Sequence, residues 1–190
     1  ASDVREGPLS RARATARACG CFERMSFRLC DGLSGIAPEE VDALVIAGMG
    51  GETIANILEA APWVKEKNFP IILQPMSTHA ELRGWLWRNG FLCLREKTVL
   101  EGETLYSIIL ARQGGAVPMT PAEEWAGRQY PGMEDPLRGL LLDHLLGRVR
   151  RALDGMARSR APAEARRREL EQVLEGLMEM RKEWDAWQQR

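Results

Sequence analysis

The chain has 190 residues, of which 45% are hydrophobic and 28% are charged, so it can bury a sizeable core and a wholly disordered protein is disfavoured. No stretch approaches the roughly 20 uncharged apolar residues that span a bilayer, and the first residues lack the apolar run of a secretion signal, so we expect a cytoplasmic protein without a membrane partner. The net charge of −1 is unevenly divided, because residues 1–136 carry 14 Lys/Arg against 18 Asp/Glu and residues 137–190 carry 12 against 9.

The start of the chain predicts a helix and a short strand. Pro8 suits the first turn of a helix, and Leu9–Ala18 follows it with good helix formers. Met25–Cys30 then alternates apolar and polar side chains, which is typical of a strand, and Asp31-Gly32 predicts the turn that ends it.

A strand, a glycine-rich junction and a helix follow. Val41–Ala47 is a nearly continuous β-branched apolar run, typical of a parallel strand that helices cover on both faces. The segment Gly48-Met49-Gly50-Gly51 predicts the end of this strand, and Glu52–Ala61 predicts the next helix, which Pro62 stops.

The same unit then repeats. Pro70–Leu73 is a predicted strand, Gln74-Pro75-Met76 its exit loop, and Ser77 the N-cap of a helix that runs to Asn89. Two such units in succession indicate a doubly wound α/β fold with a parallel sheet and right-handed crossovers. Two further strand-like runs, Phe91–Leu100 and Thr104–Ala111, have only a short turn between them and are therefore expected to be antiparallel.

The rest of the chain predicts a linker and a helical hairpin. Residues 113–136 contain most of the Gly and Pro breakers, with room for a short helix at Ala122–Tyr130. Residues 137–190 contain two helical patterns divided at Ser159–Pro162, which predict an antiparallel coiled-coil hairpin. The predicted seams are Leu142, Leu145, Val149, Ala152 and Met156 in the first helix, and Leu170, Val173, Leu177, Met180, Trp184 and Trp187 in the second.

Ligands of open α/β sheets bind at the carboxyl ends of the strands, so the residues that follow each apolar run are the site candidates. Asp3 stands at such a place, where a carboxylate can accept hydrogen bonds from both ribose hydroxyls, or it caps the helix near Pro8, or it is a surface acid. Asp31 can receive an adenine amino group, although Asp before Gly32 is more typical of a turn.

The glycine-rich junction is the most specific of these candidates. Glycines at Gly48, Gly50 and Gly51 remove side chains where a ligand approaches the backbone, with a tight turn and close helix packing as the alternative. The spacing matches neither a dinucleotide fingerprint nor a P-loop, so it does not predict a phosphate cradle. At the next strand end, Gln74 can read the edge of a base and Met76 can pack on its face, or Pro75 and Met76 are only loop and core residues.

Other residue types give weaker signals. His79 can accept a proton, but a lone histidine in the first turn of a helix is more often a capping or surface residue. The four cysteines with only two histidines do not predict a metal site. Residues 145–168 contain eight arginines against two acids, which is either a solvated face or a surface for a phosphate backbone. The candidate RNA-binding residues are Arg148, Arg151, Arg158, Arg166 and Arg167.

The strand-end motifs, taken in order, resemble those of class I S-adenosylmethionine-dependent methyltransferases. More narrowly, the chain is similar to the bacterial tRNA (adenine(22)-N1)-methyltransferase family, which shares segments like Ala1-Ser2-Asp3-Val4, Asp31-Gly32, Ile46–Gly51 and Leu73-Gln74-Pro75-Met76, followed by a helical C-terminal domain. The likeness covers residues 1–112 and, more loosely, the rest. It implies a Rossmann-like sheet with a closing antiparallel hairpin and a C-terminal helical hairpin that helps to hold tRNA.

The resemblance also implies roles for single residues. Asp3 and Val4 would contact the cofactor ribose, Asp31 and Gly32 would flank its adenine, and Ala47 and Gly48 would complete the cofactor site. The residues of the methyl-transfer pocket would be Gly48, Met49, Gly50, Gly51, Gln74, Pro75 and Met76. Adenine N1 has an in-plane lone pair, so we expect a site that aligns and desolvates the base and needs no catalytic triad.

The sequence departs from the family at its start. Family members have a strand, a glycine-bearing acidic loop and a helix before the ribose-binding acid, whereas Asp3 is here almost the first residue, so we expect an N-terminally incomplete form of the enzyme. Cys30 also stands where glycine is commoner. Two other readings stay open: a non-catalytic RNA-binding protein that retains the fold, and a nicotinamide-dependent oxidoreductase, whose glycine fingerprint is absent. The sequence predicts no oligomeric state.

Overall fold

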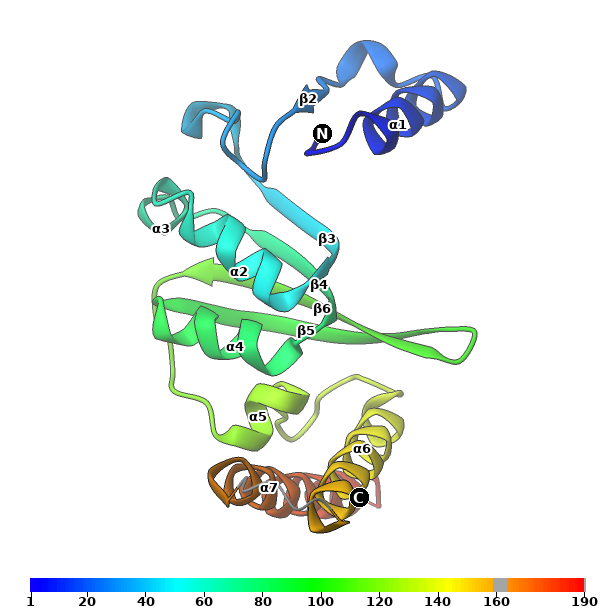
Figure 1. Cartoon of the computed structure of the whole chain (residues 1–190), viewed down its shortest axis with the longest axis vertical. Coiled ribbons are helices and arrows are strands. Elements are labelled where there is room, and N and C mark those ends of the chain that lie inside the picture. Colours follow the sequence, from blue (N-terminus) through cyan, green and yellow to red (C-terminus); the bar gives the residue numbers. More distant parts are fainter. Residues whose placement is uncertain (159–163, 190) are drawn as a thin grey trace.

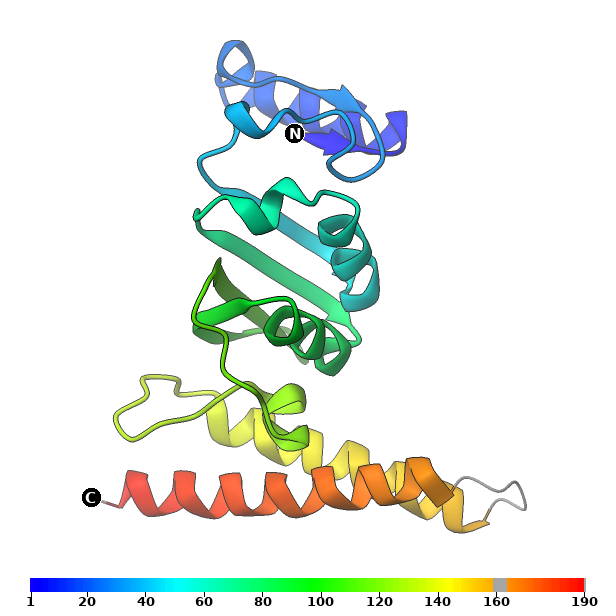
Figure 2. The ribbon, with the colours of Figure 1, turned by 90° about the vertical axis from the view of Figure 1, so that its left-hand side faces the viewer.

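Three structural layers follow one another along the long axis of the molecule. The computed structural model describes residues 1–158 and 164–189. Figures 1 and 2 show a small N-terminal unit at one end, a four-stranded sheet with its helices in the middle, and a pair of long helices at the other end. None of the helices described is both long and apolar enough to cross a membrane.

The N-terminal unit is built on two very short parallel strands. β1 (Ser2–Asp3) pairs with β2 (Arg28–Leu29), and α1 (Glu6–Ala18) connects them. The predicted helix is confirmed, with an earlier start. The strand predicted at Met25–Cys30 is wrong in length, because residues 22–24 form a 3-10 helix and β2 can form a ladder only along its two-residue partner.

The central sheet has the strand order β3-β4-β6-β5. β3 (Leu44–Gly50) and β4 (Ile71–Ser77) are parallel, as predicted, with Leu44 opposite Ile71. β3 begins later than predicted because residues 38–40 form a 3-10 helix.

The two strand exits were predicted wrongly. Gly48-Met49-Gly50 and Gln74-Pro75-Met76 lie inside β3 and β4 and pair with each other, with Met49 opposite Pro75. Register shifts on either side of Met49 bulge the ladder, and such irregular pairing tolerates a proline and glycines that would end a regular strand.

Helices α2 (Gly51–Glu59) and α4 (His79–Arg88) cover one face of this sheet side by side, and α3 (Trp63–Glu66) follows α2 (Figures 1 and 2). Their apolar side chains form the main core with the inward residues of β3, β4 and β6. The fully buried members are Ile54, Leu58, Val64, Leu73, Leu82, Leu86, Ile109 and Ala111. Along β3 and β4, the residues that alternate with these buried ones point away from the core; Val45, for example, is 63% exposed.

The N-cap of α4 differs from the prediction. Thr78, not Ser77, precedes the helix, and it adopts a left-handed conformation with φ of 48°. Its hydroxyl accepts a hydrogen bond from the backbone N–H of Glu52 at 3.1 Å. Thr78 thus caps the beginning of α2 rather than that of its own helix, which ties the two helices together where they leave the sheet.

The antiparallel hairpin is confirmed. β5 (Phe91–Glu101) and β6 (Thr104–Gln113) pair along their whole length, from Phe91 opposite Gln113 to Glu101 opposite Thr104. The tip of this hairpin projects beyond the sheet (Figure 1).

The C-terminal layer consists of α5 (Pro121–Ala126), α6 (Arg138–Arg158) and α7 (Glu164–Gln188). α5 is shorter than the predicted helix because Gly127 ends it with a positive φ of 73°. The antiparallel pairing of α6 with α7 is confirmed, with Leu142 and Val149 buried against Leu177, although the predicted seam residue Ala152 is exposed. The predicted break at Ser159–Pro162 lies outside the described residues.

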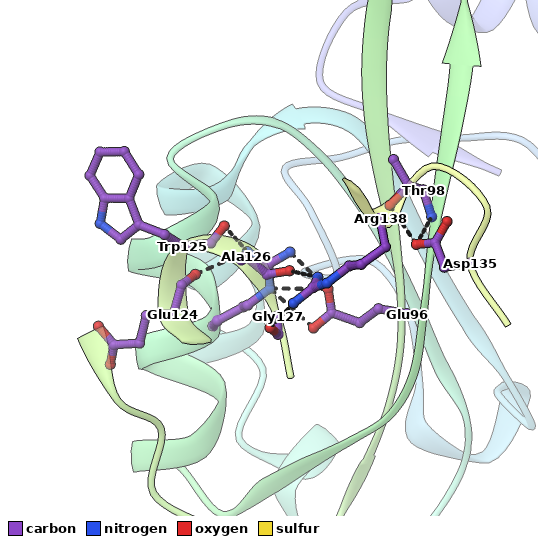
Figure 3. A network of polar contacts seen from close by, with 9 residues as sticks. Glu96, Thr98, Glu124, Trp125, Ala126, Gly127, Asp135 and Arg138 are labelled. Carbon is purple, nitrogen blue, oxygen red and sulfur yellow. Dashed lines mark hydrogen bonds and ion pairs between the residues drawn. The ribbon is translucent and has the colours of Figure 1, made fainter. Parts of the chain in front are cut away.

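A buried arginine of α4 connects the sheet to this helical layer (Figure 3). Arg83 is 1% exposed and donates to both carboxylate oxygens of Glu96 on β5, at 2.7 to 3.1 Å. Its remaining guanidinium nitrogen donates to the carbonyl oxygens of Glu124 and Trp125 at 2.9 and 2.8 Å. One side chain therefore holds α4, β5 and α5.

A second buried arginine reaches α5 from the other side. Arg138, at the start of α6, is 2% exposed and donates to the carbonyl oxygens of Ala126 and Gly127. Nearby, Asp135 accepts a hydrogen bond from the Thr98 hydroxyl of β5 at 2.7 Å. The linker predicted at 113–136 is thus fixed to both neighbours (Figure 3).

We predict that Arg83→Gln lowers the free energy of unfolding by about 3 to 5 kcal/mol, because it leaves the Glu96 carboxylate buried without its partner. Urea unfolding followed by circular dichroism measures the loss. The matched control is Arg88→Gln on the same helix, whose half-exposed ion pair with Glu124 should be worth at most about 1 kcal/mol. Equal losses for the two variants would contradict the prediction.

Candidate functional site

A cavity of about 660 Å³ lies between the two sheets. β1, the start of α1 and the turn that follows β2 form one wall, and β3 forms the other with α2. Because the strands of both sheets end on this side, their terminal residues meet there. The lining residues are Ser2, Asp3, Val4, Arg5, Pro8, Arg11, Asp31, Gly32, Leu33, Leu44, Val45, Ile46, Ala47, Gly48, Met49, Thr53 and Ile57.

Asp3 contributes a carboxylate at the end of β1. One of its oxygens accepts a hydrogen bond from the backbone N–H of Arg5 at 2.8 Å, just before α1 begins. Among the described residues the other oxygen has no hydrogen-bond partner, so it can accept from a ligand. The N-cap of α1 is Arg5, so the alternative that Asp3 caps this helix is wrong, and its role in ligand binding stays a prediction.

Asp31 and Gly32 form a turn and also line the cavity. The Asp31 carbonyl accepts from the N–H of Ser34 at 3.0 Å, which closes the turn. Gly32 has a φ of 52°, and a Cβ there would lie 2.9 Å from a methyl carbon of Ile57. Glycine at this position therefore lets the turn pack closely against Ile57 of α2. Ser2 fastens it to β1 by donating to the Gly32 carbonyl at 3.2 Å.

Gly48 exposes its backbone to the cavity. Its φ is 77°, and a Cβ built on it would meet nothing within 4 Å. Its N–H donates to the side-chain oxygen of Gln74 at 2.9 Å, which fixes the peptide across the bulged ladder. The Gln74 amide nitrogen in turn donates to the Pro75 carbonyl at 3.2 Å. In this structure Gln74 orients the Gly48 peptide, and its reading of a base edge stays a prediction.

Gly50 and Gly51 are glycines for a different reason. A Cβ on Gly51 would lie 2.2 Å from the carbonyl oxygen of Thr78, and one on Gly50 would lie 3.1 Å from the Ser77 hydroxyl. These contacts are with the backbone and side chains that follow β4, so the two glycines permit close packing of the strand ends. Close packing was the alternative that the sequence left open for the junction.

The structure brings together all the predicted cofactor residues and divides the predicted methyl-transfer residues. Gly48 and Met49 line the cavity, whereas the others of that set lie beside it at the ends of β3 and β4. Of these, Met76 is 50% exposed and Pro75 is buried.

Several lining residues were missed by the sequence analysis. Arg11 of α1 and Thr53 and Ile57 of α2 reach the cavity from helices. A helical residue near a site carries no strand-end signal, so only the mutual position of α1, α2 and β3 identifies these side chains.

The chemistry of this cavity suits a nucleoside. Two carboxylates, Asp3 and Asp31, can accept hydrogen bonds from hydroxyl and amino groups, and Gly48 leaves open space beside the main chain. Apolar side chains such as Leu33 and Ile57 provide surface for a flat ring. A volume of about 660 Å³ lies within the range of small-molecule sites.

The arginines predicted to bind RNA lie in the helical layer and are exposed. Arg166 pairs with Glu169 at 2.6 Å and Arg167 with Glu171 at 2.9 Å, so their charges are partly neutralised. The guanidinium carbon of Arg148 instead lies 5.4 Å from the centre of the Trp125 ring.

Two weaker sequence signals can be placed as well. His79 lies in the first turn of α4, as predicted, but Thr78 is the N-cap and His79 is partly buried, so the expectation of a capping or surface residue is wrong. Cys93 is mostly buried, which raises the pKa of its thiol to about 12 and keeps it protonated at neutral pH. The described residues contain no group of three His, Cys, Asp or Glu side chains that could hold a metal ion.

The sequence of this chain is similar to those of known methyltransferases. The model of a family described as Methyltransferase domain matches residues 1–109. The tRNA (adenine(22)-N(1))-methyltransferase of Bacillus subtilis is 33% identical over 114 residues, which are 60% of this chain and 48% of that protein. The chain thus spans about half the length of this curated relative.

Solved structures are similar over nearly the whole chain. A Streptococcus pneumoniae protein described as a candidate tRNA (m1A22) methyltransferase has a TM-score of 0.78 at 25% identity, over 95% of this chain and 80% of that one. A second structure of it, in complex with S-adenosyl-L-methionine, has a TM-score of 0.77 at 25% identity, over 95% and 79%.

We predict that Gly51→Ala lowers the free energy of unfolding by about 1 to 3 kcal/mol, because the added methyl group forces the backbone at Thr78 to move. Urea unfolding measures the change. Gly7→Ala is the matched control, since a Cβ at this α1 position meets nothing within 4 Å and should cost less than about 0.5 kcal/mol. If both variants are equally stable, close approach is not what requires Gly51.

We also predict a pH-dependent contribution from His79. Burial, and then the charges of Arg83 and Arg148, lower the pKa of its imidazole from about 6.5 to about 4. Between these values the unfolded chain binds a proton that the folded chain does not, so stability present above pH 6.5 is lost as the pH falls.

Between pH 7 and pH 4.5, His79→Gln should therefore lose about 2 to 3 kcal/mol less stability than the unsubstituted chain. Urea unfolding at both pH values tests this, with the exposed His144→Gln as the control. Identical pH profiles for the His79 variant and the unsubstituted chain would refute it.

Proposed function

Because the methyltransferase-domain model matches more than half of its residues, this chain belongs to that family, and we propose that it transfers a methyl group from S-adenosyl-L-methionine to N1 of an adenine in tRNA. The observation that carries the proposal is the meeting of Asp3, Asp31 and Gly48 at one cavity between the two sheets. The tRNA substrate and the position of the base in this proposal come from the description of the Bacillus subtilis relative, and the cofactor comes from the Streptococcus pneumoniae structure.

The cofactor would lie along the ends of β1, β2 and β3. The free oxygen of Asp3 would accept from the ribose hydroxyls, with Val4 beside it, and Asp31 and Gly32 would flank the adenine ring. The open backbone at Ala47 and Gly48 would face the reacting end. These roles fit the donors and acceptors present, because a carboxylate has no hydrogen atom to donate and must receive one from the ligand.

When bound, S-adenosyl-L-methionine supplies a sulfonium methyl group, which adenine N1 can take with its in-plane lone pair without first losing a proton. The protein then has to align and desolvate the base. Gly48 and Met49 would border the methyl group, and the exposed Met76 offers an apolar face for the base. Gln74 would hold the Gly48 peptide in place. A base taken out of its stack could enter beside the strand ends.

The helical layer would hold the rest of the tRNA. Its candidates are the exposed arginines Arg148, Arg151, Arg158, Arg166 and Arg167. This assigns residues 1–112 to the methyltransferase domain, 113–136 to the linker and 137–190 to RNA binding. A protein that acts on tRNA would work in the cytoplasm. The alternative, an RNA-binding protein without activity, predicts tRNA binding without cofactor binding.

We predict that Asp3→Asn weakens binding of S-adenosyl-L-methionine about ten- to a hundredfold, because it removes a charged acceptor from the cavity. Isothermal titration of the full chain measures the affinity. Asp154→Asn makes the same change on α6, far from the cavity, and should leave it unaltered. An unchanged affinity in Asp3→Asn would remove this residue from the site.

The target base is tested with tritiated cofactor and two tRNA transcripts that differ only at adenine 22. Replacement of this adenine by guanine should abolish methyl incorporation. Undiminished incorporation would refute the assignment of the base, and tRNA binding without cofactor binding would favour the non-catalytic alternative.

A further inference from the structure

A second cavity, of about 300 Å³, lies where the sheet meets the helical layer. Its walls are the start of α4, the β5–β6 hairpin, α5, α6 and the start of α7. It shares no lining residue with the cavity between the two sheets. Two of its lining residues, Arg148 and Arg166, are among the candidate RNA-binding arginines, but the cavity itself has been given no ligand so far.

Thr78 connects this junction cavity to the candidate methyl-transfer residues. It is one of the lining residues. Its carbonyl is the group that Gly51 approaches, and its hydroxyl accepts from Glu52 at the start of α2. Among the non-glycine residues that the structure describes, Thr78 alone has a positive φ. This backbone conformation costs energy and is concentrated at functional sites. A ligand in the junction cavity would therefore lie next to the end of β4.

The charged groups in the junction cavity favour an anion. Arg148 and Arg166 line it, and Arg148 forms no ion pair with any carboxylate of the described residues. α4 begins at its wall, with the positive end of the helix dipole. Burial lowers the pKa of the lining residue His79, and the charges of Arg83 and Arg148 lower it further, so its imidazole is neutral at pH 7. The acids Glu81 and Glu103 also line the cavity, and Arg166 is paired with Glu169, so the cationic group free to hold an anion among the described lining residues is Arg148.

The other walls are apolar. Leu105, Leu141 and Leu145 lie there with the indole of Trp125, over which the Arg148 guanidinium is placed. This combination suits a nucleotide. Its phosphate can bind to the cationic side chains, and its base can pack on the flat aromatic and aliphatic surface. The volume is at the lower end of the range for small-molecule sites, which suits one nucleotide.

We propose that the junction cavity binds one nucleotide of the RNA substrate next to the methylated adenine, with its phosphate at Arg148 and its base against Trp125 and the leucines. This inference rests on the proposed function and adds a second contact to it. The helical layer would then help to place the target base, because the lining residue Thr78 directly follows the last residue of β4.

The test compares two substitutions on the same helix. Arg148→Gln removes a charge from the cavity, and Arg150→Gln removes one from an exposed position that does not line it. Fluorescence anisotropy of labelled tRNA at several salt concentrations gives the affinity and its salt dependence for the full chain. We expect Arg148→Gln to weaken binding about five- to tenfold and to reduce the salt slope by about one, with less than a twofold effect in Arg150→Gln.

A second measurement uses adenosine 5′-monophosphate alone. It should shift the Trp125 indole N–H resonance in the unsubstituted chain and shift it less in Arg148→Gln. Equal tRNA affinities in the two variants, or no shift of Trp125, would overturn the nucleotide site.

Cofactor titration separates this outcome from failure of the proposed function. A chain that binds S-adenosyl-L-methionine and tRNA but shows no difference between the variants retains the proposed function and loses only the junction site. A chain that binds neither refutes both.

Discussion

The buried guanidinium groups of Arg83 and Arg138 fix how the two halves of the molecule meet. The last four carbonyls of any helix lack hydrogen-bond partners within the helix. Where the helix end is buried, other groups of the protein must donate to these carbonyls. At the end of α5, Arg83 takes the carbonyls of Glu124 and Trp125, and Arg138 takes those of Ala126 and Gly127. The end of α5 is thereby held between an arginine of α4 and one of α6.

This arrangement has a consequence for function because α4 also begins at the site. Its first residues line the junction cavity, its N-cap Thr78 touches the Gly51 backbone, and its buried Arg83 holds the helical layer. A rigid helix of ten residues therefore connects the strand ends, where the base would be methylated, with the layer that would carry the tRNA.

The sequence predicted the types of nearly all elements and misplaced those boundaries that depend on partners. Hydrophobic periodicity belongs to a single segment, so α1, the β5–β6 hairpin and the α6–α7 pair were recoverable from it. The ends of β3 and β4 were not, because Met49 and Pro75 are strand residues only by pairing with each other across a bulge. Arg83 was also missed, since a lone arginine in an amphipathic helix normally lies on its exposed face.

The candidate site, too, was only partly predictable from the sequence. Asp31 and Gly48 could be selected from the sequence because each follows a strand-like run, and Asp3 because its segment resembles the end of a strand. Parallel strands that end on one side bring such residues together. The triple-glycine junction could not be resolved further, because a run of glycines has the same sequence signal whether a ligand or a backbone occupies the freed space. Here Gly48 faces open space, whereas Gly51 faces the Thr78 carbonyl at 2.2 Å from where a Cβ would lie. Of these two glycines, only Gly48 could therefore contact a ligand directly, whereas Gly51 lets α4 begin close to the candidate site.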